Sequence, residues 1–174
     1  DLKQAPLLMG NAGRQTFFLW LHDAYGFPRA NLRPYNHSLA PFLNDPRAAM
    51  QGFATAEPER IREASGKQPR VFLLADHGWP PYSTTIVCME KTIKERPKAV
   101  AAFVKATMEG WKSYLADPAP GNALIKKDNP NMTDDQLAYS VSKLKEMGMV
   151  TGGDAAKMGI GIMTDVRAKA SYDF

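Results

Sequence analysis

The residues best suited to chemistry are two carboxylates and two aromatic rings that follow apolar, strand-like segments. Glu57 ends one such segment, and Asp76, Trp79 and Tyr82 follow a second one at 71–75. In open α/β sheets, ligands bind beyond the carboxyl ends of the strands. The pattern therefore predicts a binding cleft, in which the carboxylates accept hydrogen bonds and the rings stack on a planar or apolar ligand.

Other interpretations of these residues are simpler. Glu57 can serve as an early acid of a helix over 58–65. Trp79 and Tyr82 can pack in a core, and Asn36 and Tyr35, at the end of an earlier strand, can join either arrangement.

Catalytic and metal sites are not expected. Asp76 and His77 are adjacent, and adjacent residues of an extended chain point to opposite faces, so they form no dyad. No serine or cysteine stands in a nucleophile motif, and the three histidines lack metal-ligand spacing. We therefore expect no catalytic residue, no metal and no cofactor.

A glycine-containing turn between a strand and a helix is a second candidate. It comprises Gly10, Asn11, Ala12, Gly13 and Arg14. Glycines let the backbone approach a ligand, and a helix start offers unpaired N–H groups to an anion, with Arg14 as a further partner. The pattern is neither a dinucleotide fingerprint nor a phosphate-binding P-loop, and an ordinary tight turn is the alternative.

The first half of the chain alternates strand and helix signals. Strands are predicted at 6–9, 32–36 and 51–56, and helices at 14–25 and within 39–50. Gly26 suits a left-handed helix cap. This order predicts a parallel sheet and an α/β fold class.

The second half is mainly helical. After one β-like run at 84–89, apolar residues recur at helical spacing over 99–115, behind Pro97. Thr133 to Gln136 form a capping box, and a last helix is expected from Thr164. Two amphipathic helices and one strand are too few layers to bury their apolar stripes, so we infer that a further sheet is missing or is supplied by a partner.

Composition sets broad limits. A hydrophobic share of 44% with 23% charged residues is ordinary for a soluble globular protein. The net charge of +4 is modest and its basic residues lack interleaved aromatics, so no nucleic-acid partner is expected. The single cysteine, Cys88, excludes an intrachain disulfide and is interpreted as a small buried hydrophobe.

The runs GFATAEP, RVFLLADHGWPPYSTTIVCMEKTIKERPKAVAAFVKATMEGWKSYLADP and GMVTGGDAAKMGIGIMTDVRAKASYDF resemble substrate-binding proteins of ABC importers. Within these the chain is most similar to the NMT1/THI5-like group, which includes binders of thiamine-precursor pyrimidines, sulfonates, taurine and nitrate. The resemblance implies a type II periplasmic-binding-protein fold, with two α/β lobes, a hinge and a ligand between the lobes.

The resemblance also implies a division of the chain. Residues 1–74 correspond to lobe two, 75–83 to a hinge crossing, and 84–174 to the returning part of a lobe one whose N-terminal part is absent. Its ligand-binding positions match the Gly10 to Thr16 turn, Asn36, the strand end from Thr55 to Glu57, and the segment from Asp76 to Tyr82.

The resulting expectation is a non-enzymatic receptor that delivers a small organic solute to a membrane permease. It would be periplasmic or extracellular, with a signal peptide that is not in this chain, and a monomer when full length. The alternatives are a pyrimidine-phosphate synthase-like enzyme, whose cysteine-rich motif Cys88 alone does not match, and the effector-binding domain of a transcription regulator.

Overall fold

The computed structural model describes residues 1–79 and 81–173. Pro80, in the predicted crossing, and Phe174, at the end of predicted lobe one, lie outside the described residues. The chain divides into two compact units, Asp1–Trp79 and Pro80–Asp173, and their boundary falls inside the predicted crossing at 75–83. The assignment of the units to lobes stays a prediction.

The first unit is built on a three-stranded parallel sheet of β1 (Leu7–Met9), β2 (Leu32–Pro34) and β3 (Ala49–Met50). β1 lies in the centre, with Leu7 opposite both Leu32 and Ala49. The predicted mixed α/β architecture, with its parallel sheet, is confirmed. All three strands therefore end at the same edge of the sheet.

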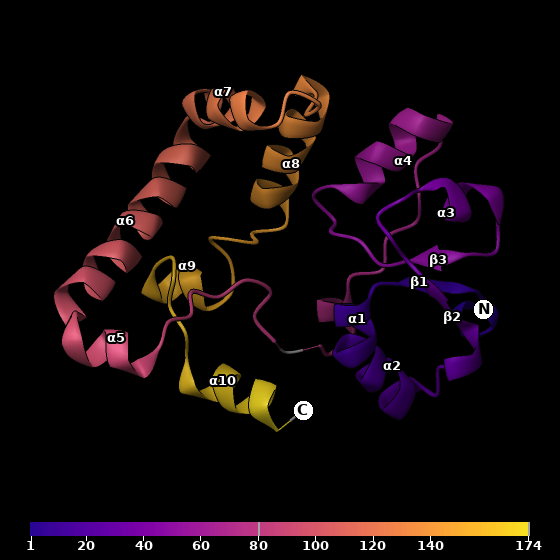
Figure 1. Ribbon diagram of the computed structural model, residues 1–174, viewed down its shortest axis with the longest axis horizontal. Coiled ribbons are helices and arrows are strands. Elements are labelled where there is room, and N and C mark those ends of the chain that lie inside the picture. The colour runs from indigo at the N-terminus through magenta and orange to yellow at the C-terminus, as the bar shows by residue number, and fades with distance from the viewer. Residues whose placement is uncertain (80, 174) are drawn as a thin grey trace. The chain divides into compact units, whose positions relative to one another are not determined.

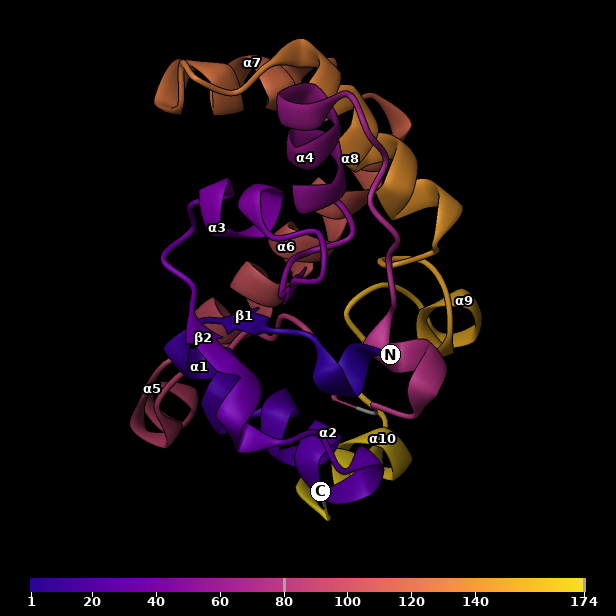
Figure 2. The same ribbon diagram turned by 90° about the vertical axis from the view of Figure 1, so that its right-hand side faces the viewer.

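Helices cover both faces of this sheet (Figures 1 and 2). α1 (Asn11–Gln15) and α2 (Phe17–Tyr25) lie on one face, and α3 (Ala40–Asn44) and α4 (Glu57–Ser65) lie on the other. Short 3-10 turns complete the unit at Leu2–Gln4, Arg29–Asn31 and Leu74–His77.

The core of the first unit follows the alternation of β1. Leu7 and Met9 point toward α2 and pack with Phe18, whose side chain is fully buried. Leu8 is buried on the opposite face, where Ile61 of α4 is also buried. Because β1 is apolar on both faces, it is suited to the centre of a parallel sheet.

The local helix signals are mostly confirmed. Gly26 adopts the predicted left-handed cap, with φ of 72°, and its N–H bonds the His22 carbonyl at 2.9 Å. The single helix predicted over 14–25 is wrong, because the chain breaks at Thr16 (φ −122°, ψ −104°) into α1 and α2. The Thr16 hydroxyl donates to the Ala12 carbonyl at 2.8 Å, which competes with continuous helix at this point.

Three predicted strands are wrong. β3 ends at Met50, and residues 51–56 form a turn in which the amides of Ala56 and Glu57 bond the Phe53 carbonyl. Residues 71–75 run into a 3-10 turn that begins at Leu74, and residues 84–89 form neither helix nor strand. A strand requires a neighbour to pair with, and no described backbone hydrogen bond joins residues 71–75 or 84–89 to another strand.

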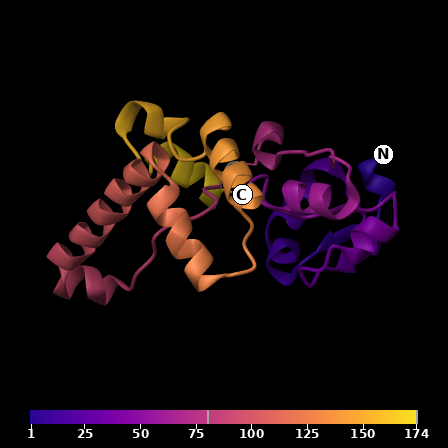
Figure 3. The same cartoon turned by 90° about the horizontal axis from the view of Figure 1, so that it is seen from above.

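The second unit contains α5 (Glu90–Glu95), α6 (Pro97–Ala116), α7 (Ala119–Asp128), α8 (Asp134–Glu146), α9 (Asp154–Met158) and α10 (Asp165–Tyr172). α6 is the longest helix, and α7 leaves its end at a sharp turn (Figures 1 and 3). α7 was not predicted because Pro120 and Gly121 interrupt its pattern. The Tyr114 hydroxyl secures it by donating to Asn122 Oδ1 at 2.7 Å.

The threonine cap of the predicted capping box and the predicted helix start at Thr164 are confirmed. Thr133 Oγ1 accepts from the Gln136 N–H at 3.1 Å, and Thr164 begins α10 by accepting from the Arg167 N–H at 3.4 Å. The unit has little core: among its described residues, Leu137 and Val141 are the only buried large apolar side chains. None of the described helices is long and apolar enough to cross a membrane.

Candidate functional site

The carboxyl edge of the sheet in the first unit gathers most of the predicted binding residues. Gly10 follows β1, Tyr35 follows β2 and Gln51 follows β3. The parallel register pairs Met9 with Pro34, so the residues that come next lie side by side. This is the position at which parallel sheets bind ligands.

Gln51 is a residue that the sequence pattern missed, because the predicted third strand placed it at a strand start. Its side-chain Oε1 accepts the Gly10 N–H at 2.9 Å, which joins the ends of β1 and β3. A Cβ atom on Gly13 would stand 2.4 Å from the same oxygen and 2.7 Å from Phe17 Cζ. A larger residue at Gly13 would therefore displace the side chains packed beneath the turn.

At the helix start after β1, one of the N–H groups expected to be free for an anion is already bonded. α1 has only five residues, and the Gly10 N–H is already used by Gln51. Asn11 and Ala12 are exposed on its first turn. Arg14 Nε donates to the Met9 carbonyl at 3.0 Å, while its Nη2 atom is buried without a hydrogen-bond partner among the described residues.

Tyr35 carries the second unsatisfied polar atom at this edge. Its side chain is 9% exposed, and its hydroxyl is buried with no partner in the described structure. Burial raises the pKa of this phenol, the negative charge of Glu57 raises it further, and Arg60 partly opposes the increase. The hydroxyl is therefore neutral and available to donate or accept a hydrogen bond.

Glu57 begins α4 beside these groups. Its Oε2 accepts the Phe53 N–H at 2.5 Å, and Arg60 Nη1 lies 3.8 Å from its Oε1. Glu57 therefore begins a helix and also lies at the sheet edge, so the two predicted positions of this residue are compatible. Thr55 is half-buried in the preceding turn, close along the chain to this carboxylate.

Asn36 also lies at this edge, but its Oδ1 accepts the Ser38 N–H at 3.3 Å and shapes the local loop. Arg60 was not singled out from the sequence. The carboxyl edge therefore brings together the glycine turn, Arg14, Tyr35, Asn36 and Glu57, which the sequence had singled out, and adds Gln51 and Arg60.

The remaining predicted residues lie elsewhere. Asp76 is exposed in the 3-10 turn. Trp79 packs on α2, with its ring centroid 5.4 Å from Trp20 and 6.3 Å from Phe17. Phe17 also underlies Gly13, so this aromatic cluster adjoins the glycine turn.

Tyr82 belongs to the second unit. Its hydroxyl accepts the Thr164 N–H at 3.0 Å, and the Arg167 guanidinium lies 4.1 Å from its ring centroid. Thr164 in turn donates to Asp154 at 2.9 Å. Tyr82 therefore fastens the start of this unit to its last helix, and its role as a ligand contact stays a prediction.

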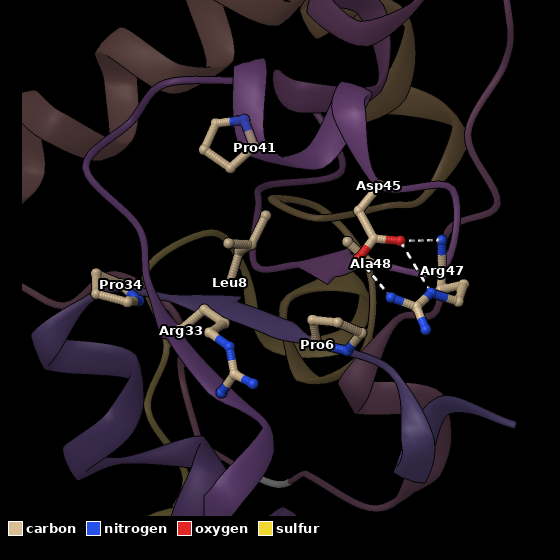
Figure 4. Close-up of a pocket in the computed structure, with 8 residues that line it drawn as sticks. All are labelled: Pro6, Leu8, Arg33, Pro34, Pro41, Asp45, Arg47 and Ala48. Atoms are coloured by element: carbon tan, nitrogen blue, oxygen red, sulfur yellow. Dashed lines mark hydrogen bonds and ion pairs between the residues drawn. The ribbon is translucent and has the colours of Figure 1, made fainter.

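A separate hollow of about 490 Å³ lies on the α3 face of the sheet (Figure 4). It is lined by Pro6, Leu8, Arg33, Pro34, Pro41, Asp45, Arg47 and Ala48. Figure 4 shows Leu8 near its centre, Pro41 above it and the Asp45–Arg47 pair at one side. The hydrogen bonds from Arg47 lower the pKa of the Asp45 carboxyl.

The polar groups around this hollow are already satisfied. Arg47 Nε bonds Asp45 Oδ1 at 3.2 Å, and Arg33 Nη1 donates to two backbone carbonyls at 2.7 and 2.9 Å. The carboxyl edge, in contrast, holds two buried polar atoms that have no partner among residues 1–79 and 81–173. Because a buried unsatisfied group requires an explanation, the carboxyl edge is the stronger candidate site.

No group of histidine, cysteine and carboxylate side chains in the described part of the chain could hold a metal ion. In a comparison with protein families, the family model described as "NMT1/THI5 like" matches residues 32–120. No curated protein and no solved structure matches the chain.

Proposed function

Because this chain belongs to the NMT1/THI5-like family, we propose that it is the solute-binding component of an ABC importer. A domain of this family fits a solute-binding protein or a related member of the superfamily, and such proteins are typically extracellular or periplasmic. The importer role, the permease partner and a periplasmic or extracellular location of this chain are parts of the proposal.

The observation that carries the proposal is the buried, unpartnered hydroxyl of Tyr35 at the carboxyl edge of a parallel sheet. Leaving such a group unsatisfied costs about 1–3 kcal/mol. A solute that accepts or donates one hydrogen bond there would recover much of this cost. The recovered free energy would favour binding of the solute at this site. Arg14 Nη2 supplies a second unmet donor at the same edge.

The solute we propose is small and polar or aromatic: a pyrimidine of the thiamine-precursor kind, a sulfonate or an aromatic acid. Arg14 would donate to its anionic or carbonyl oxygen, Glu57 would accept from its N–H groups, and Tyr35 would hydrogen-bond its polar edge. Binding would stabilise a closed form of the receptor, which the permease recognises.

Isothermal titration with 4-aminopyrimidine, 2-aminoethanesulfonate and benzoate tests this proposal. Binding of at least one probe with a micromolar Kd, worth about 8 kcal/mol, is expected. Glu57→Gln should weaken that binding, while Glu63→Gln, an exposed position on the same helix, should not. If none of the probes binds below roughly millimolar concentration, the proposed solute class is wrong.

We also propose that the protein binds its solute without converting it. The bound probe should be recovered unchanged after prolonged incubation with the protein, as followed by proton NMR of the solution. Conversion of the probe would favour the synthase-like enzyme instead, and replacing His77 by alanine would then show whether that residue takes part.

A further inference from the structure

His37 follows β2 at the carboxyl edge of the sheet and has a backbone conformation that is unfavourable for most side chains. Its φ is 67°, and the seven other described residues with positive φ are all glycines. A left-handed backbone at a residue with a side chain is strained, and such strain concentrates at ligand-binding and switch regions. Glycine would relieve this strain, so the imidazole is present at position 37 although it makes the backbone there less stable.

The loop that carries His37 holds its ring beside Tyr35. Asn36 Oδ1 accepts the Ser38 N–H at 3.3 Å, and Ser38 Oγ accepts the Ala40 N–H at 3.3 Å, so the backbone is fixed on both sides. The ring centroids of His37 and Tyr35 lie 5.2 Å apart, with their planes inclined by 53°. A solute that bonds the unpartnered Tyr35 hydroxyl would therefore lie close to the imidazole.

The imidazole of His37 is available to a ligand. The residue is exposed, and neither of its ring nitrogens has a hydrogen-bond partner in the part of the chain that the structure describes. In its neutral form an imidazole has one donor and one acceptor nitrogen, and its flat face stacks on planar groups. A flat ring with polar substituents can use both properties, whereas an aliphatic solute can use only the hydrogen bonds.

We infer that His37 is a solute-contacting residue that makes the site selective for planar ring solutes. Its imidazole stacks on the ring of the solute, while the Tyr35 hydroxyl bonds the polar edge. The preferred solutes are then pyrimidines or aromatic acids rather than aliphatic sulfonates. This inference rests on the proposed function and narrows its solute class. The sequence pattern pointed to Trp79 and Tyr82 for stacking and did not single out His37.

Titration calorimetry on the 174-residue chain tests the inference. The unmodified chain should bind benzoate or 4-aminopyrimidine more tightly than 2-aminoethanesulfonate. His37→Asn removes the ring but keeps a residue type that readily adopts the left-handed conformation. This variant should bind the better planar probe about two- to tenfold more weakly, because the stacking contact is lost.

Tyr172→Asn provides a matched control, because it removes an aromatic ring that is 89% exposed on α10 of the second unit. It should leave the affinity for the planar probe unchanged, and circular dichroism checks that both variants are folded. A histidine with only a packing role in its loop would change stability without changing affinity. Unchanged affinity in folded His37→Asn therefore overturns the inference, as does an equal loss of affinity in Tyr172→Asn.

Proton NMR of the isotope-labelled chain detects the contact without a substitution. The Hδ2 and Hε1 protons of His37 should shift when a planar probe is added, and they should show nuclear Overhauser effects to the ring protons of the probe. A planar probe that binds without these effects overturns the inference and leaves the proposed function intact, as does tighter binding of 2-aminoethanesulfonate than of either planar probe. If none of the three probes binds, the proposed solute class and this inference fail together.

Discussion

Replacing Tyr35 by phenylalanine should stabilise the first unit while weakening solute binding. The phenol oxygen is buried and has no partner in the described structure, so its removal relieves a cost of about 1–3 kcal/mol. For a unit of this size, each kcal/mol corresponds to a rise in Tm of about 4–8 °C. A bound solute would lose one neutral hydrogen bond, so its Kd should increase roughly two- to tenfold.

The two effects are measured separately. Urea unfolding followed by tryptophan fluorescence in a Trp111→Phe background reports on the first unit, because Trp20 and Trp79 then remain. Titration calorimetry with a probe that binds the unmodified chain gives the change in affinity. A tyrosine with only a packing role would show no specific change in affinity.

The pKa of Tyr35 gives the same variant a signature at alkaline pH. Its pKa is raised above 10.0 in the folded chain, chiefly by burial, so folding favours the neutral phenol. The associated stability is complete below pH 10.0 and declines as the pH rises through the raised folded value. Tyr35→Phe should lack this part of the alkaline decline.

The reasoning is refuted if Tyr35→Phe lowers the free energy of unfolding of the first unit by about 1 kcal/mol or more, because the hydroxyl would then be satisfied in the unliganded protein. Increased stability with unchanged affinity for every bound probe would refute the contact between Tyr35 and the solute while leaving the structural argument intact.

Three further predictions concern stability. Gly13→Ala should lower the free energy of unfolding of the first unit by about 1–3 kcal/mol, because its Cβ would lie 2.4 Å from Gln51 Oε1, and adding Gln51→Ala should recover part of the loss in urea unfolding. The hydrogen bond from Arg62 lowers the pKa of Glu59 in the folded chain, so the unmodified unit should lose stability as the pH falls from 4.5 through that lowered pKa. Urea unfolding midpoints measured across this pH range check the loss, and the Arg62→Gln variant should not show it. Gly110→Ala should stabilise α6 by about 0.5–1 kcal/mol, because no atom lies within 4 Å of the new Cβ; a lower thermal midpoint by circular dichroism would contradict this.

Local sequence patterns could predict the elements that depend on contacts between residues close together in the sequence. The left-handed cap at Gly26 and the side-chain caps at Thr133 and Thr164 depend on nearby hydrogen bonds, and each is present. The apolar run of β1 likewise predicted a buried strand. These features need no knowledge of distant parts of the chain.

The features that could not be predicted depend on distant partners. Gln51 bonds Gly10, which is 41 residues away, and no local spacing signals that contact. The segment 84–89 has a strand sequence, yet pairing requires a neighbour that the described residues do not provide. The unpartnered Tyr35 hydroxyl is visible only when its whole surroundings are known.

The central claim is that a small solute binds at the carboxyl edge of the sheet in the first unit. Amide chemical shifts of the labelled chain, recorded during titration with the best-binding probe, test it most directly. The account predicts that shift changes concentrate at residues 10–14, 35–36 and 51–57. Changes centred instead on Arg33, Asp45 and Arg47, around the hollow beneath α3, would contradict it, as would saturable binding that leaves the edge unshifted.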